Sequence, residues 1–175
     1  HTLSGTMATA DWWWTDKGGY MATAGALSGI TGKGAHGLII DDPHKNVSEA
    51  HSKTIREKVW DEYRGTFLTR LQPEGFQCII QTRWHEDDLT GRLMKNEGDE
   101  WTKIILPALD ERGRSLFPER FSSEELLQKR ATMGSYLFDA LYQQRPSPKD
   151  GGMFKAGWFQ YYQEHPTQFD KIIQS

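Results

Sequence analysis

Between residues 38 and 82 the spacing of apolar residues changes twice, and this change constrains the fold more than any other feature. Leu38 to Ile40 is a short apolar run that stops at an aspartate, which indicates a strand. From Ser48 to about Leu71 apolar side chains recur every four residues, which predicts an amphipathic helix. Phe76 to Thr82 then indicates a second strand. A strand, a helix and a strand in this order predict an α/β fold with a mostly parallel sheet flanked by helices.

Local signals place the other elements around this unit. Asn46 and Glu49 resemble a capping box at the start of the long helix, and Pro73 and Gly75 are expected to close it. We expect strands over 10–16, 20–27 and 101–106, a glycine-rich loop over 28–37, and helices that begin at Asp87 or Asp88, at Ser122 or Ser123, and at Ser135, the last running to Gln144.

Length and composition fit one domain with a small appendage. The chain has 175 residues, a net charge of −3 and one cysteine, Cys78, which is expected to be an inert core residue. No apolar run approaches the roughly 18 residues of a membrane span. The chain does not begin with Met and stops in an apolar run, so we expect a piece of a longer protein. We predict a core over 1–107, a helical subdomain and linker over 108–152, and a connection to a further domain over 153–175.

Two carboxylates, Asp41 and Asp42, follow the apolar strand directly. An aliphatic strand that ends in an acid is the Walker B pattern of P-loop NTPases, in which the first carboxylate holds Mg²⁺ and a neighbouring one can polarise the attacking water. The alternative is a strand end at which the aspartates begin a turn or cap a helix. Ligands bind at the carboxyl ends of parallel strands, and the run TRWHEDD at 82–88 reaches the same edge of the sheet.

The phosphate loop that a Walker B strand requires is absent, because the pattern GxxxxGK[ST] does not occur. The nearest segment, GITGKG at 29–34, has Gly after Lys33 and leads into a strand instead of a helix. We interpret it as a loop in which Lys33 either lies near phosphate or DNA or is simply solvated. The residues that would bind the nucleotide therefore remain unknown.

Several segments, in this order, resemble the bacteriophage terminase large subunit, the ATP-driven motor that packages DNA into procapsids. They are GGYMATAGALSGITGKGAHGLIIDDPHKN, SKTIREKVWDEYRGTFLTRL, QTRWHEDDLTGRL, LFPERFSSEEL, SYLFDALYQQRPSPKDGGMFK and WFQYY, and they cover about residues 18 to 175. The resemblance implies the C-terminal half of a P-loop NTPase-like ATPase domain followed by a helical linker. The Walker A region and the nuclease domain are not in this sequence, so we expect the chain alone to be inactive.

The resemblance also implies roles for four residues. Asp41 matches the metal aspartate and Asp42 the catalytic carboxylate, which is Glu in many relatives, while Thr82 and Arg83 match the motif that couples ATP hydrolysis to movement. The implied cofactors are Mg²⁺ and ATP. The implied partners are double-stranded DNA, the terminase small subunit, the portal protein and further copies in a ring, in the cytoplasm of a bacterial host and with no membrane.

Alternatives remain open from the sequence. Arg83 is expected either to sense phosphate or to pair with a local acid. A non-catalytic interaction module would use the aromatic tail that contains Trp158, Phe159, Tyr161 and Tyr162. A free-standing metal nuclease would use the acids and histidines at 41–44 and 85–88.

Two further groups of side chains could contact nucleic acid. The side chains of Trp12, Trp13 and Trp14 either stack on bases or pack in a core. A set of basic residues forms either a DNA-facing patch or a solvated helix face: Lys53, Arg56, Lys58, Arg64 and Arg70.

Overall fold

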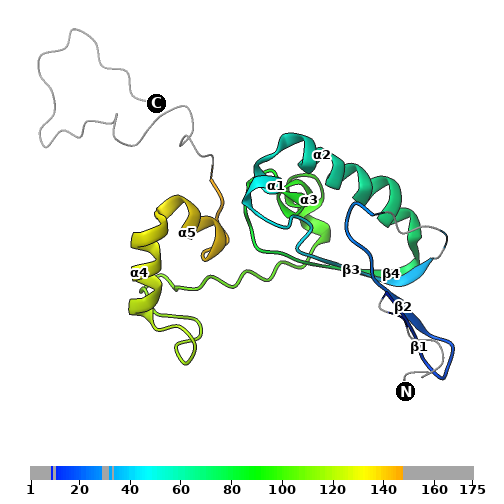
Figure 1. The fold of residues 1–175 in the computed structure, drawn as a ribbon, viewed down its shortest axis with the longest axis horizontal. Coiled ribbons are helices and arrows are strands. Elements are labelled where there is room, and N and C mark those ends of the chain that lie inside the picture. Colours follow the sequence, from blue (N-terminus) through cyan, green and yellow to red (C-terminus); the bar gives the residue numbers. More distant parts are fainter. Residues whose placement is uncertain (1–8, 10, 29–31, 33, 148–175) are drawn as a thin grey trace, which may run out of the picture.

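The computed structural model describes residues 9, 11–28, 32 and 34–147. Its centre is a parallel pair of strands, β3 (Ala35–Asp41) and β4 (Leu71–Ile80), whose register joins Ile39 to Cys78 and Asp41 to Ile80. Helices α1 (Val47–His51) and α2 (Lys53–Glu62) connect the two strands, and α3 (Leu89–Glu97) follows them (Figure 1). The predicted strand–helix–strand unit is therefore confirmed. The described part is a mixed α/β fold with a small parallel sheet flanked by helices.

The long helix predicted over 48–71 is interrupted at Ser52. This residue has extended backbone, closes α1, and accepts a hydrogen bond from the N–H of Ile55 to begin α2. Beyond α2 the winding changes to a π-helix, η1 (Tyr63–Phe67), and then to a 3₁₀ turn, η2 (Leu68–Arg70). The single helix was a wrong prediction because a serine that caps the following turn offers the backbone an alternative to continuing the helix.

Pro73 and Gly75 do not close a helix, because β4 already begins at Leu71. The register jumps from Ala35 opposite Leu71 to Gly37 opposite Phe76, so the residues between them form a bulge in β4. Glu74 in this bulge has a φ of 63°, a conformation that is uncommon outside glycine. A bulge accommodates the proline because its missing N–H falls outside the ladder.

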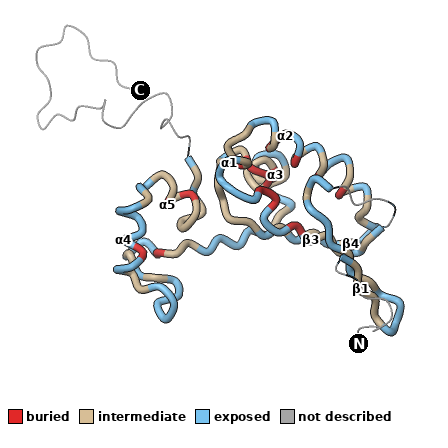
Figure 2. Tube along the Cα trace, viewed as in Figure 1, coloured by how far each residue is buried: buried red, intermediate tan, exposed pale blue. Residues whose placement is uncertain are grey.

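Among the described residues, the helices cover one face of the β3–β4 sheet. Ile40 packs there in a cluster with the buried side chains of α2, η1 and α3, which are Val59, Tyr63, Phe67, Leu89 and Leu93. The opposite face carries Ile39, Phe76 and Ile80, which are 57%, 59% and 55% exposed. Figure 2 shows the buried residues gathered in β3 and the helices, including α4 and α5, with exposed stretches between them. Parallel sheets normally have both faces covered, whereas no element in the described part of the chain covers this apolar face.

A second, smaller unit follows an extended stretch. Residues 101–106 were predicted as a strand, but they pair with no strand among the described residues, and Ile104 is 80% exposed. Helices α4 (Ser123–Met133) and α5 (Ser135–Leu141) then pack around Leu109, Leu126 and Phe138. Ser122 and Glu125 form the capping box of α4, and α5 ends before the predicted Gln144.

At the other end, β1 (Trp12–Trp14) and β2 (Tyr20–Ala22) form a separate antiparallel hairpin, which departs from the predicted parallel pattern. The Trp12 and Trp14 rings stack at 6.4 Å between centroids, and Tyr20 packs against both. All three tryptophans are half-buried, and none belongs to either core cluster of the described residues. Across the described part of the chain, no helix is both long and apolar enough to cross a membrane.

Candidate functional site

The two aspartates and the threonine–arginine pair occupy neighbouring strand ends. β3 finishes at Asp41 opposite Ile80, the last residue of β4, because the two strands are parallel and in register there. The N–H of Asp42 still donates to the carbonyl of Ile80 at 2.9 Å. The N–H of Thr82 donates in return to Asp42 Oδ1 at 2.9 Å, which joins the two strand ends directly. The structure thus brings the predicted residues Asp41, Asp42 and Thr82 together at one edge.

Asp42 has an unusual backbone conformation, with a φ of 40°. Non-glycine residues rarely adopt positive φ, although aspartate does so more readily than most. The chain turns sharply here before Pro43 and His44, which are both buried. Because such conformations persist only where the surroundings impose them, the turn and the bond to Thr82 hold the Asp42 carboxylate in one orientation.

Asp41 is exposed, as Asp42 is, but its side chain lacks the hydrogen bond to a described residue that Asp42 makes with Thr82. Its carboxylate makes no hydrogen bond or ion pair with any residue that the structure describes. Magnesium in phosphate-transfer sites is usually held by one or two carboxylates, several waters and the substrate phosphates. A single accessible carboxylate at a strand end fits that requirement, with Asp42 beside it. No group of three or more His, Cys, Asp or Glu in the described part is placed to hold a metal ion by itself.

Arg83 takes the alternative that the sequence left open, an ion pair with a local acid. Its Nε lies 2.7 Å from Asp88 Oδ2 and 3.0 Å from Oδ1. The Asp88 side chain is only 1% exposed and also accepts from the N–H of Gly91, so it caps α3. The guanidinium therefore secures the 83–88 turn in this structure.

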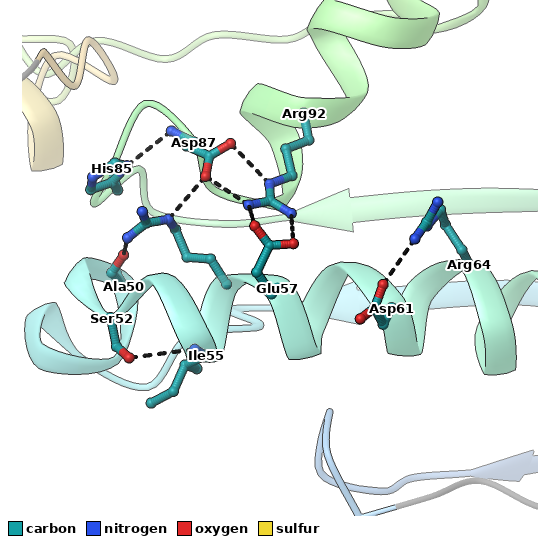
Figure 3. A network of polar contacts seen from close by, with 10 residues as sticks. Ala50, Ser52, Ile55, Glu57, Asp61, Arg64, His85, Asp87 and Arg92 are labelled. Atoms are coloured by element: carbon teal, nitrogen blue, oxygen red, sulfur yellow. Dashed lines mark hydrogen bonds and ion pairs between the residues drawn. The ribbon is translucent and has the colours of Figure 1, made fainter.

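A network of charges fastens that turn to α2 (Figure 3). Arg92 of α3 donates to both oxygens of Asp87, at 2.9 and 2.7 Å, and to both oxygens of Glu57, at 3.1 and 3.0 Å. Arg56 adds a bond to Asp87 at 3.2 Å and another to the Ala50 carbonyl at 2.7 Å. The hydrogen bonds from Arg92 hold the pKa of both Asp87 and Glu57 below the usual values.

The histidines are tied into the same region. His85 Nδ1 accepts from the N–H of Asp87 at 3.0 Å, and its ring meets that of His51 edge-on at 5.4 Å. Burial, with the charge of Arg56 next in size, lowers the pKa of His85. Burial also lowers the pKa of His44. These contacts and the engaged Asp87 carboxylate give His85 a structural role in the turn.

The sequence did not predict the contact between Gln144 and Arg83. Gln144 Oε1 accepts from the N–H of Arg83 at 3.2 Å, although the two residues are 61 positions apart. The neighbouring Gln143 instead exchanges two hydrogen bonds with the backbone of Leu109 inside the small unit. The only sequence signal is the pair of glutamines before the linker, and nothing in it indicates which residue they contact.

Other sequence predictions meet mixed outcomes. Lys53, Lys58 and Arg64 are exposed, as a solvated helix face requires, but Arg56 is buried and ion-paired, so it belongs to neither predicted alternative. Cys78 is exposed on the uncovered face of β4, so its assignment to the core was wrong. Lys33 and the aromatic tail from Trp158 to Tyr162 lie outside the described residues.

The comparison with known proteins identifies no family for this chain. No protein-family model matches the chain, and no curated protein matches it.

Proposed function

We propose that this chain is part of the ATPase domain of a terminase large subunit, the motor that uses ATP to move DNA into a viral procapsid. The observation that carries the proposal is the hydrogen bond from the Thr82 N–H to Asp42 Oδ1 at 2.9 Å. It places an acid pair and a polar pair on adjacent parallel strand ends, which is where α/β sheets bind their ligands.

The chemistry follows from the two carboxylates. Asp41 is accessible and would hold Mg²⁺, which neutralises charge on the phosphates of ATP when it is bound. Asp42 has one oxygen engaged by the Thr82 N–H, so Oδ2 is left to accept a hydrogen bond from a water molecule. A carboxylate that orients and deprotonates water can act as the general base for attack on a phosphate. Thr82 is coupled to this group through its own backbone.

The uncovered sheet face supports the second part of the proposal, that these residues are one half of a larger domain. Ile39, Phe76 and Ile80 would contact a further layer of that domain, which would also supply the phosphate loop. By the resemblance, the assembled motor would be a ring that acts on double-stranded DNA together with a small subunit and a portal, in the host cytoplasm.

ATP turnover by a longer form of the chain that extends upstream of His1 tests this proposal. We expect Asp41→Ala to abolish turnover and Asp42→Ala to reduce it by about 10²- to 10⁴-fold, the range typical of a lost general base. Asp61→Ala is the matched control, because Asp61 is an exposed acid that pairs with Arg64 on the helix surface, away from the strand ends. Full turnover by Asp41→Ala, or an upstream region without a phosphate loop, would refute the ATPase.

The same exposed face favours one alternative, a non-catalytic module that binds a protein partner. In that case Ile39→Asp and Ile80→Asp weaken partner binding, whereas Asp41→Ala leaves binding unchanged and the longer chain does not turn over ATP. The two proposals therefore differ in whether the acid pair or the apolar face carries the activity.

A further inference from the structure

Two consecutive backbone amides are held by side chains from different parts of the chain. The N–H of Thr82 donates to Asp42, at the end of β3, at 2.9 Å. The next N–H, that of Arg83, donates to Oε1 of Gln144, beyond α5, at 3.2 Å. Only the two soft dihedral angles of Thr82 separate these amides, because the peptide unit between them is planar. The direction of one N–H relative to the other is therefore set by these two angles alone.

Gln144 is fixed within the small helical unit. Its Nε2 donates to the carbonyl of Leu141 at 2.7 Å, and its backbone has a φ of 57°. Its side chain lies with Arg83 at a groove of about 550 Å³ between β4, α3 and residues 101–106. The side chain of Arg83 also pairs with Asp88, the residue that caps α3, and this bond fixes the dipeptide Thr82–Arg83 to α3. Three elements thus meet at Thr82 and Arg83.

We propose that Gln144 is a positioning residue that transmits the position of the Asp42 carboxylate to α5 and α4 through the amides of Thr82 and Arg83. A shift of the carboxylate lengthens the bond to Thr82, turns the Arg83 N–H, and moves or releases Gln144. Only the cause of the shift of Asp42 depends on the proposed function. The path itself is a property of the described residues.

The test uses the present chain without nucleotide, observed by backbone NMR. Gln144→Ala should raise the hydrogen-exchange rate of the Arg83 amide by about three- to tenfold, the effect of removing one modest hydrogen bond. Gln144→Glu keeps the acceptor for the Arg83 N–H but loses the bond from Nε2 to the Leu141 carbonyl, so it should raise the exchange rate less than Gln144→Ala does. Gln143→Ala is the matched control, since it removes a neighbouring glutamine that bonds the backbone of Leu109, and it should leave the Arg83 amide unchanged.

Transmission is tested by adding Asp42→Ala. In the parent chain and in Gln143→Ala, Asp42→Ala should shift the amide resonances of residues 141–144. In the Gln144→Ala background these shifts should disappear, which is the non-additivity expected of coupled groups. Unchanged resonances at 141–144, or equal shifts with and without Gln144, overturn the proposal. Neither result depends on ATP turnover, so failure here leaves the ATPase proposal standing and failure of the ATPase leaves the path intact.

Discussion

Arg83 and Asp88 form a largely desolvated ion pair, with Nε 2.7 Å from Oδ2 and side chains that are 18% and 1% exposed. Arg83→Ala leaves a buried carboxylate without its partner, and breaking such a pair costs about 3–5 kcal/mol. Asp88→Asn keeps an acceptor for the Gly91 N–H and leaves a partly exposed arginine, so we expect a smaller loss, about 1–2 kcal/mol. Urea unfolding of both variants measures the difference, and an Arg83→Ala chain as stable as the parent would contradict this role of the ion pair.

Gly91 lies where a side chain has no room. A Cβ there would be 1.9 Å from the backbone carbonyl oxygen of Glu86. Backbone cannot give way as a flexible side chain can, so Gly91→Ala should distort the 83–88 turn and cost about 1–3 kcal/mol, the range for overpacking.

Gly65 is the matched control, because nothing lies within 4 Å of the Cβ it would gain and its backbone is helical. Gly65→Ala should leave stability unchanged or raise it by about 0.5–1 kcal/mol. Thermal unfolding followed by circular dichroism reports both, and equal effects of the two substitutions would show that the close approach at Gly91 is unimportant.

His44 should make the chain sensitive to mild acid. Burial lowers its pKa in the folded chain below the usual 6.5, against the opposing charges of Asp88 and Glu49, with Arg56 and Arg92 adding to the decrease. The unfolded chain therefore takes up a proton first as the pH falls, and the free energy of unfolding decreases from about pH 6.5 downward until the folded pKa is reached. His85 titrates in the same direction.

His44→Gln removes one of these two groups, so the decrease in unfolding free energy between about pH 6.5 and 5 should become shallower. His36→Gln is the control, because His36 is exposed on β3. Denaturant titrations at several pH values measure the slope, and identical slopes in the parent and His44→Gln would rule out this role for His44.

Cys78 offers a direct measure of the uncovered sheet face. It is the one cysteine of the chain and it is exposed beside Phe76 and Ile80. A thiol reagent should modify it in the folded chain within about threefold of the rate in denaturant, because the exposed thiol is accessible to the reagent in both states. In a longer form that supplies the further layer proposed for the ATPase domain, the reaction should slow by about tenfold or more. Slow modification in the present chain would mean that the face is already covered.

Local patterns predicted the parts of the fold that local chemistry controls. The cap that Asn46 provides to the N–H of Glu49 was expected from residue type and spacing. The caps at Ser122 and Asp88 are each one of the two positions that the sequence offered. The four-residue period identified Val59, Tyr63 and Phe67 as the buried side of the helix, even though the helix is broken at Ser52.

Contacts between distant residues were less accessible to sequence reasoning. An apolar run such as 101–106 becomes a strand only if a strand edge is available, and the pattern of the run itself does not reveal the partner. Likewise the bond between Gln144 and Arg83 depends on how α5 is placed, which no spacing encodes. The neighbouring positions of Asp42 and Thr82 were predicted because parallel strands bring their carboxyl ends to one edge. Their catalytic and coupling roles remain predictions.

The one-sided sheet has a practical consequence for handling this chain. Strand edges and apolar surfaces left without neighbours are templates on which like molecules associate. We expect two copies to bury Ile39, Phe76 and Ile80 against each other at the concentrations used for crystallisation and to separate on dilution. Self-association should therefore increase with protein concentration, and a mild detergent or a charged residue at position 80 should suppress it.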